Sequence, residues 1–161
     1  MSTPQTPSEF PHHVADQPEA ITVVGLELRT TNPEAMQTIP PHWQRFGQEG
    51  VLDRISGRVD GDVLAVYTHF ANAGRDNTGL YSLVIGAQVT PDAPVPAGMV
   101  RVVVPAGPRA IFPVLPASFD RVGPAWGAVW AQTALPKTFV AEFERYGAHG
   151  DISISIGLGR H

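Results

Sequence analysis

The 161-residue sequence contains no cysteine, no long apolar segment and no concentration of basic residues. Without cysteine, the chain has no disulfides, thiolate metal ligands or cysteine nucleophiles. Its apolar runs are interrupted by Gly, Pro or charge, and they fall short of the roughly 20 residues that a transmembrane helix needs. The 11 Lys and Arg residues are scattered and the formal net charge is -4. We therefore expect neither direct nucleic-acid binding nor a membrane partner.

The chain contains enough hydrophobic residues to form the core of one folded domain. Hydrophobic residues make up 43% of the chain, an ordinary fraction for a soluble globular protein. The first 19 residues are rich in Pro, Ser, Thr, Gln and His and lack apolar periodicity, so we expect a flexible tail over 1–19 and a domain over 20–161. The N-terminus has neither the charged nor the apolar segment of a secretory signal, which makes the cytoplasm the expected location.

Two segments predict helices. The first begins near residue 33 with a capping side chain, an early proline and an acidic residue close to the positive end of the helix dipole. Apolar side chains then recur at helical spacing. We expect Pro40 and Pro41 to kink or restart this helix, so that its main part covers residues 43–48. The second helix is expected over about 118–130.

Apolar and β-branched segments predict strands at 21–28, 63–70, 80–89, 99–104, 110–115, 138–146 and 151–158. The order strand, helix, strand, strand occurs twice. This repetition predicts an α+β domain of tandem βαββ halves with pseudo-twofold symmetry, antiparallel sheets, two main helices and a central cleft. A junction between related halves is where a small-molecule pocket is most often found.

The segment from Phe139 to Tyr146 carries two carboxylates in the pattern of a strand. Since alternate side chains of a strand point to opposite faces, Glu142, Glu144 and Tyr146 share one face. Acidic residues are depleted in strands, and a carboxylate there is solvated, paired or positioned for a ligand. Two interpretations stay open: a solvated sheet face, or a carboxylate at the bottom of a ligand cleft.

Short motifs follow one another in a recognisable order: Val24-Gly25-Leu26, Ile39-Pro40, Val66-Tyr67-Thr68, Gly79-Leu80-Tyr81, Val104-Pro105-Ala106-Gly107, Trp126 and Phe143-Glu144-Arg145-Tyr146. Over about residues 20–158 the chain resembles the GyrI-like effector-binding domain. This small-molecule-binding module occurs at the C-terminus of many AraC- and MerR-type regulators and also as a free-standing protein. The resemblance implies a tandem βαββ fold with the ligand in a cleft between the halves. It also implies a central glutamate, which the Phe-Glu-x-Tyr pattern assigns to Glu144 rather than Glu142.

Aromatic side chains around that glutamate suit a flat or hydrophobic ligand. Tyr67, Trp126 and Tyr146 are the expected walls, while Glu144 compensates a positive charge or accepts a hydrogen bond. His69 shares its strand face with Tyr67 and is a further candidate lining residue.

Arg109 departs from the resemblance, because the family commonly has an aromatic residue at this place. In the cleft, Arg109 would pair with Glu144 and weaken any preference for cations. Outside the cleft it would be solvated, which is the alternative we expect.

Three functions remain open, none of which requires a cofactor or a metal. The leading one is a free-standing protein that binds a hydrophobic, aromatic or cationic small molecule. The second is a hydrolase of strained, electrophilic small molecules, as implied by some free-standing relatives, with Glu144 as general base and Tyr67 or Tyr146 as hydrogen-bond donor. The third is an interaction with gyrase, as implied by a gyrase-inhibitory relative. The sequence names neither the ligand nor its fate, nor the oligomeric state.

Overall fold

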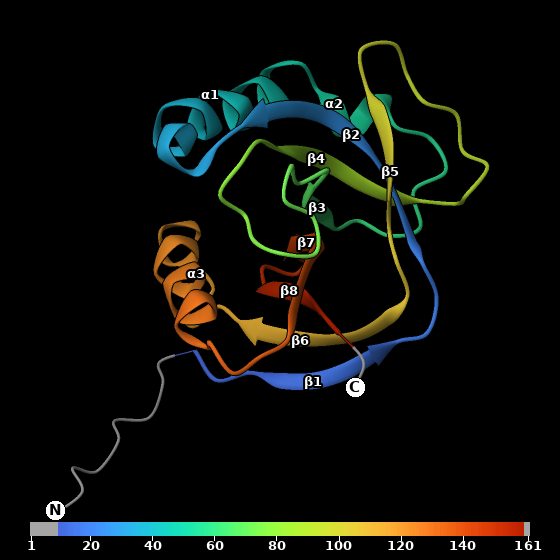
Figure 1. Ribbon diagram of the computed structural model, residues 1–161. Helices are drawn as coiled ribbons and strands as arrows, with labels where there is room; N and C mark the ends of the chain where they lie inside the picture. Colours follow the sequence, from blue (N-terminus) through green and yellow to red (C-terminus); the bar gives the residue numbers. More distant parts are fainter. Residues whose placement is uncertain (1–9, 160–161) are drawn as a thin grey trace, which may run out of the picture.

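The computed structural model describes residues 10–159, which form one antiparallel eight-stranded sheet with three helices packed on it (Figure 1). The strands are β1 (His13–Gln17), β2 (Ile21–Thr30), β3 (Val63–Thr68), β4 (Tyr81–Val89), β5 (Val100–Val104), β6 (Gly107–Pro113), β7 (Lys137–Tyr146) and β8 (Ile152–Leu158). The helices are α1 (Ala35–Gln48), α2 (Val51–Arg54) and α3 (Val122–Ala131), and single 3-10 turns precede α1 and α3. The predicted α+β class is confirmed.

The strand order in the sheet relates the two halves of the chain. From edge to edge it runs β1-β6-β8-β7-β3-β4-β2-β5. The elements β2-α1-β3-β4 are therefore repeated as β6-α3-β7-β8, with β3 and β7 side by side at the centre of the sheet. The halves also exchange their edge strands, since β1 pairs with β6 and β5 pairs with β2. A single sheet thus carries both βαββ halves.

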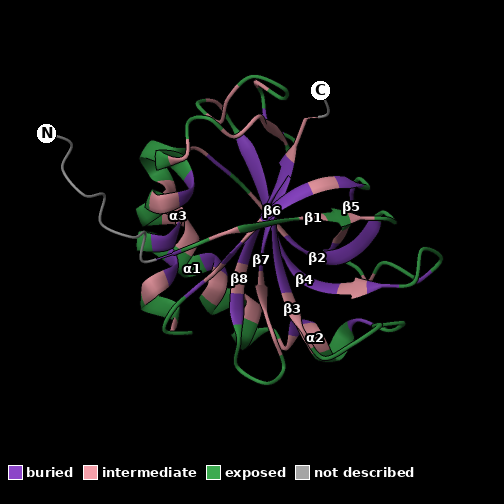
Figure 2. Ribbon diagram, turned by 90° about the horizontal axis from the view of Figure 1, so that it is seen from below, coloured by how far each residue is buried: buried purple, intermediate pink, exposed green. Residues whose placement is uncertain are grey.

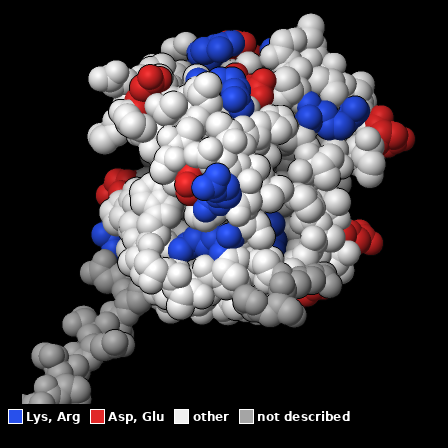
Figure 3. All heavy atoms as spheres, viewed as in Figure 1, with Lys and Arg blue, Asp and Glu red and all other residues white. Residues whose placement is uncertain are grey.

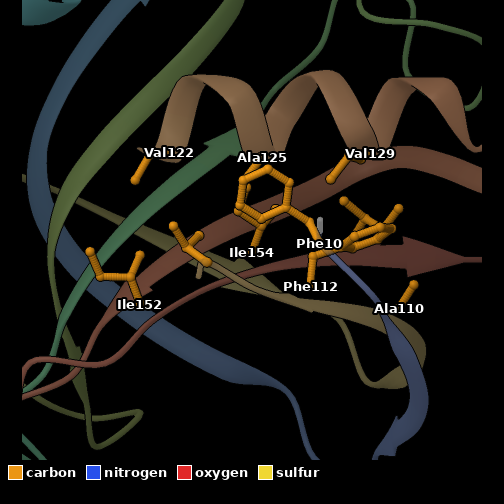
Figure 4. Packing of buried hydrophobic residues seen from close by; sticks show 10 residues of the cluster. Phe10, Ala110, Phe112, Val122, Ala125, Val129, Ile152 and Ile154 are labelled. Carbon is orange, nitrogen blue, oxygen red and sulfur yellow. The ribbon is translucent and has the colours of Figure 1, made fainter. Parts of the chain in front are cut away.

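β1 lies in the segment whose composition predicts a flexible tail. His13–Gln17 pairs antiparallel with β6, and the side chain of Phe10 is buried beneath α3 against Phe112 (Figure 4). The edge of β6 supplies unpaired backbone donors and acceptors, and these stabilise an added strand whatever its side chains. The ordered domain therefore includes residues before residue 20. Residues 1–9 of the expected tail lie outside the described residues.

Apolar side chains are buried on both faces of the sheet. On one face, α3 packs Val122, Ala125 and Val129 against a cluster that contains Phe112 and Ile154 (Figure 4). The opposite face curls around a second cluster, made up of Ile21, Val23, Leu64, Val66, Val84, Val102, Val104, Ala141 and Phe143. Figure 2 shows the result, with largely buried strands and with exposed residues on the outer sides of α1 and α3. The helices cover only one face of the sheet.

α1 continues through Ala35–Gln48 although Pro40 and Pro41 lie inside it. Each proline removes one backbone hydrogen bond of the helix. Both prolines are exposed, so water can hydrate the carbonyl groups that lose their partners. On the buried side, His42 Nε2 donates a hydrogen bond to the Leu26 carbonyl oxygen at 2.8 Å. Contacts with the sheet hold the helix together, and the expected restart after the prolines is wrong.

Two glycines mark the closest approach of neighbouring strands. Gly25 of β2 is paired with Gly86 of β4. A Cβ atom added to Gly86 would lie 1.9 Å from the Val24 carbonyl oxygen, and one added to Gly25 would lie 2.4 Å from the Ile85 carbonyl oxygen. Neither position accepts a side chain unless the two strands move apart.

The substitution Gly86→Ala is expected to lower the free energy of unfolding by about 1–3 kcal/mol, the usual cost of overpacking a core. The matched control is Gly127→Ala in α3, where an added Cβ has no neighbour within 4 Å. Because alanine favours helix interiors, that variant should be about 0.5–1 kcal/mol more stable than the wild type. Urea denaturation measures both changes. Equal stabilities of the two variants would contradict the close approach of the strands.

Charged side chains are dispersed over the face that Figure 3 shows. Asp and Glu stand apart from one another there and do not form an acidic patch. An acidic surface that imitates nucleic acid would need such a concentration of charge. Within residues 10–159, none of the helices has the length and apolar character required to cross a membrane.

Candidate functional site

A cavity of about 450 Å³ opens between α1 and α3. Both halves of the chain contribute to it: α1, β3, β4 and their loops from the first half, and α3 and β7 from the second. Its lining consists of Asn32, Ala35, Met36, Ile39, Tyr67, Phe70, Asn77, Tyr81, Gly123, Trp126, Trp130 and Glu142. The volume falls in the range of small-molecule sites, about 300–1,000 Å³.

Aromatic rings form one wall of this cavity. The centroids of Tyr67 and Trp126 are 5.3 Å apart with their planes nearly perpendicular, and Tyr67 lies 5.8 Å from Tyr81. Trp130, one helical turn after Trp126, extends the wall toward the surface at a centroid distance of 5.9 Å. Such rings offer flat apolar area, and their electron-rich faces attract cations.

Glu144 lies behind this wall and accepts three hydrogen bonds. Its Oε2 atom accepts from Tyr67 Oη and Trp126 Nε1, each at 2.7 Å. Its Oε1 atom accepts from Tyr146 Oη at 2.5 Å. The three donors belong to β3, α3 and β7. One carboxylate therefore ties together the two halves of the chain and fixes the orientation of two rings of the wall.

The electrostatics of this network follow from its burial. Burial raises the pKa of Glu144, although the hydrogen bonds from Tyr146, Trp126 and Tyr67 oppose the shift. Burial, reinforced by the Glu144 carboxylate, also raises the pKa of the Tyr67 and Tyr146 hydroxyls far above the usual value. Both phenols therefore keep their protons and remain hydrogen-bond donors to Glu144.

Glu142 is the carboxylate that lines the cavity. Only 3% of the residue is exposed, and its side chain makes no hydrogen bond or ion pair with any of residues 10–159. Burial raises the pKa of Glu142 to about 7, against the opposing charges of Arg109 and Lys137. The site thus contains a carboxylate that lacks a direct partner and changes its charge near neutral pH.

The structure brings together only part of the predicted site. Tyr67 and Trp126 line the cavity as expected. Glu144 is buried behind them, and Tyr146 packs away from the cavity against Trp43, with ring centroids 5.1 Å apart. The two glutamates share a face, as the alternation predicts, but that face is not solvated because each residue is only 3% exposed.

His69 does not reach the cavity. It follows the last residue of β3 with a positive φ of 51°, which turns its side chain out of the strand pattern. The side chain is 56% exposed, and its Nδ1 atom lies 3.7 Å from Glu27 Oε2. The expected lining role of His69 therefore fails, because the strand ends just before this residue.

Arg109 occupies neither of its two expected places. It lies on the opposite face of the sheet, only 4% exposed. Its Nε atom donates a hydrogen bond to Ser155 Oγ at 2.6 Å, and Nη2 donates to the Ala141 carbonyl oxygen at 2.8 Å. The guanidinium is thus neither paired with Glu144 nor solvated, because neighbouring strands supply its acceptors.

Sequence reasoning missed several lining residues. Trp130 follows Trp126 by four positions, and this spacing alone places both on one side of a helix. Tyr81 begins a mainly apolar strand, and that pattern does not distinguish a lining residue from a core residue. Gly123 and Met36 carry no chemical signal, since they only shape the space.

Known proteins share both sequence features and fold with this chain. Residues 16–156 match the family model of Cass2, described as integron-associated effector binding protein. No curated protein matches the chain significantly. The integron cassette protein VCH_CASS2 of Vibrio cholerae has 23% identity, a TM-score of 0.68, and coverage of 93% of this chain and 97% of its own.

A second solved structure is SAV2435 bound to tetraphenylphosphonium. It has 18% identity to this chain and a TM-score of 0.71, and the alignment covers 92% of this chain and 94% of that protein. At such identities the likeness concerns the fold.

Proposed function

Because the chain belongs to the Cass2 family of integron-associated effector binding proteins, we propose that it binds a hydrophobic organic cation in the cavity between α1 and α3. The observation that carries the proposal is Glu142, a buried carboxylate that opens on an aromatic wall without a direct partner. A carboxylate in such a place has lost hydration without full compensation. A bound cation supplies the missing charge.

The aromatic wall accounts for the hydrophobic part of the ligand. Rings of Tyr67, Tyr81 and Trp126 contact the flat groups of a bound molecule, and their faces add cation–π attraction. The cavity volume of about 450 Å³ suits a ligand with several rings. SAV2435, which shares the fold, is bound to tetraphenylphosphonium; this aromatic cation belongs to the proposed ligand class.

Glu144 has a different role in this proposal. Its two oxygens accept three hydrogen bonds from Tyr67, Trp126 and Tyr146. A general base must lie within reach of the substrate's proton or of water, but Glu144 is buried and does not line the cavity. Glu144 is therefore better suited to hold the rings in place than to catalyse hydrolysis, and binding is the function that we propose.

Filling the cavity from α3 tests where the ligand lies. An added Cβ meets no atom within 4 Å at Gly123 or at Gly127, but only Gly123 lines the cavity. Gly123→Leu is expected to weaken methyltriphenylphosphonium binding about tenfold, the equivalent of losing roughly 55 Å² of apolar contact. Isothermal titration calorimetry measures the dissociation constants.

Gly127→Leu is the matched control for this experiment, because it adds the same side chain to the same helix outside the cavity. Its dissociation constant for methyltriphenylphosphonium should equal that of the wild type. If both substitutions weaken cation binding equally, or if neither weakens it, the cation lies outside this cavity.

A further inference from the structure

The opposite face of the sheet holds a buried positive charge, that of Arg109. Arg109 is 4% exposed, and its hydrogen bonds go to the Ser155 hydroxyl and to the carbonyl oxygens of Ala141 and Ser155. Across residues 10–159 no carboxylate forms an ion pair with it. Burial lowers the pKa of Arg109 to about 10, so the guanidinium is charged at neutral pH.

The hydrogen bonds of this guanidinium involve only two of its three nitrogen atoms, Nε and Nη2. Nη1 donates no hydrogen bond within the described part of the chain. A Cβ atom added to Gly157 would lie 3.4 Å from Arg109 Nη1 and 2.8 Å from Thr138 Oγ1. Both donor groups therefore lie beside Gly157. The Thr138 hydroxyl likewise has no hydrogen-bond partner among residues 10–159.

Arg109 and Thr138 both line a hollow of about 160 Å³. The other lining residues are apolar or carry no polar side chain: Pro105, Ala106, Gly107, Pro108, Val140, Ala141 and Leu158. Among the described residues, none that lines the hollow is acidic, so none of them repels an anion. The hollow therefore combines a polar end, with a guanidinium and a hydroxyl, and apolar walls.

We propose that this hollow is a second binding site, which takes a small carboxylate carrying a short apolar group. A guanidinium presents N–H donors in a fixed geometry that matches a carboxylate, and Thr138 adds a hydroxyl donor. The apolar walls accept the rest of the molecule, and an apolar cavity of about 150 Å³ is large enough for benzene. Benzoate has both parts and is the probe for this site.

A neighbouring hollow shows what distinguishes this site. Arg109 also borders a space of about 290 Å³ beside Arg145. There the second arginine is already paired, with Nη1 2.9 Å from Asp62 Oδ2, and Asp16 belongs to the lining. Acidic groups thus offset the positive charge on that side. On the side of Thr138, the lining contributed by residues 10–159 has no acidic group, and this is the side that attracts an anion.

The site is coupled to the aromatic cavity through charge. The positive charge of Arg109 lowers the pKa of Glu142 against the larger effect of burial. A carboxylate bound to Arg109 offsets that charge, which favours protonated Glu142 and weakens cation binding in the cavity. This antagonism rests on the proposed function, whereas the carboxylate site itself does not.

Benzoate titrated into isotope-labelled protein tests the site by nuclear magnetic resonance. We expect saturable shifts centred on the backbone amides of Thr138 and Gly157. Arg109→Gln and Thr138→Val should each weaken benzoate at least about tenfold, the loss expected when a charge-assisted contact or its supporting donor is removed. Arg75→Gln, in an exposed loop, removes the same charge elsewhere and should leave benzoate affinity unchanged.

The remaining variants keep the proposal testable if Arg109→Gln does not fold. Gly157→Ala places a Cβ atom 2.8 Å from Thr138 Oγ1, which displaces that hydroxyl and should weaken the benzoate-induced shifts. Inorganic phosphate lacks an apolar group and should bind more weakly than benzoate. Shifts that map elsewhere, Thr138→Val and Gly157→Ala variants that bind benzoate like the wild type, or tighter binding of phosphate would each overturn the proposal. Benzoate binding without any binding of methyltriphenylphosphonium would refute the proposed function and leave the carboxylate site standing.

Discussion

The affinity for methyltriphenylphosphonium is expected to increase about tenfold to a hundredfold from about pH 5 to about pH 8, the range that one charge-assisted contact provides. The cause is Glu142, whose pKa burial raises to about 7. A cation favours the ionised carboxylate, so it lowers the pKa of Glu142 in the complex and releases a proton. The affinity therefore rises with pH until the free protein has lost this proton, and then levels off.

Two controls isolate the carboxylate in this experiment. Glu142→Gln should remove the pH dependence and bind the cation at all pH values as weakly as the wild type does near pH 5. Triphenylphosphine oxide carries three rings and no net charge, and its affinity should hardly change with pH. A pH dependence that survives in Glu142→Gln would assign the charge response to another group.

The same substitution, Glu142→Gln, is expected to make the protein more stable as the pH rises, relative to the wild type. The difference in free energy of unfolding between Glu142→Gln and the wild type should grow by about 3 kcal/mol in favour of the variant from about pH 4 to about pH 8. The pKa of Glu142 is raised from 4.5 to about 7 by burial. In this window the folded wild type binds more protons than the unfolded chain, so its stability falls as pH rises. Glutamine does not ionise and has no such loss.

Urea denaturation at a series of pH values measures this difference. Glu19→Gln is the matched control, because Glu19 is exposed and its replacement should leave the wild-type pH profile unchanged. Parallel profiles for the wild type and Glu142→Gln would mean that Glu142 is hydrated in the folded protein. In that case the main support for the cation site would be lost.

The two glutamates of β7, Glu142 and Glu144, have different roles in the proposed site. The family resemblance assigns the central role to Glu144. In the structure Glu144 accepts hydrogen bonds from Tyr67, Trp126 and Tyr146, whereas Glu142 lines the cavity. The charge of Glu142 is therefore expected to act directly on a charged ligand, whereas Glu144 is expected to act indirectly by holding the rings in place.

Family membership was predictable because its signal is spread along the chain. Single short motifs such as Val24-Gly25-Leu26 are weak, but their order over most of the domain is informative. The resemblance to GyrI-like effector-binding domains is confirmed by the family match over residues 16–156 and by the shared fold. The pair Gly25 and Gly86 shows one physical basis for such motifs, since the paired strands β2 and β4 leave no room for a Cβ atom there.

The amino-acid sequence by itself determined the features that depend on neighbours along the chain. Alternation placed Glu142 and Glu144 on one strand face, and apolar periodicity located the main helices and seven of the eight strands within a few residues. These features follow from backbone geometry, because a strand repeats every two residues and a helix about every 3.6.

Only the tertiary structure decided the features that depend on partners distant in sequence. β1 is a strand because it pairs with the open edge of β6. α1 remains helical despite two internal prolines because it packs on the sheet. Tyr67 and Trp126, from β3 and α3, satisfy Glu144 and leave Glu142 facing the cavity. Desolvation and hydrogen bonding depend on which groups are in contact in the folded protein, and the local sequence pattern does not specify those contacts.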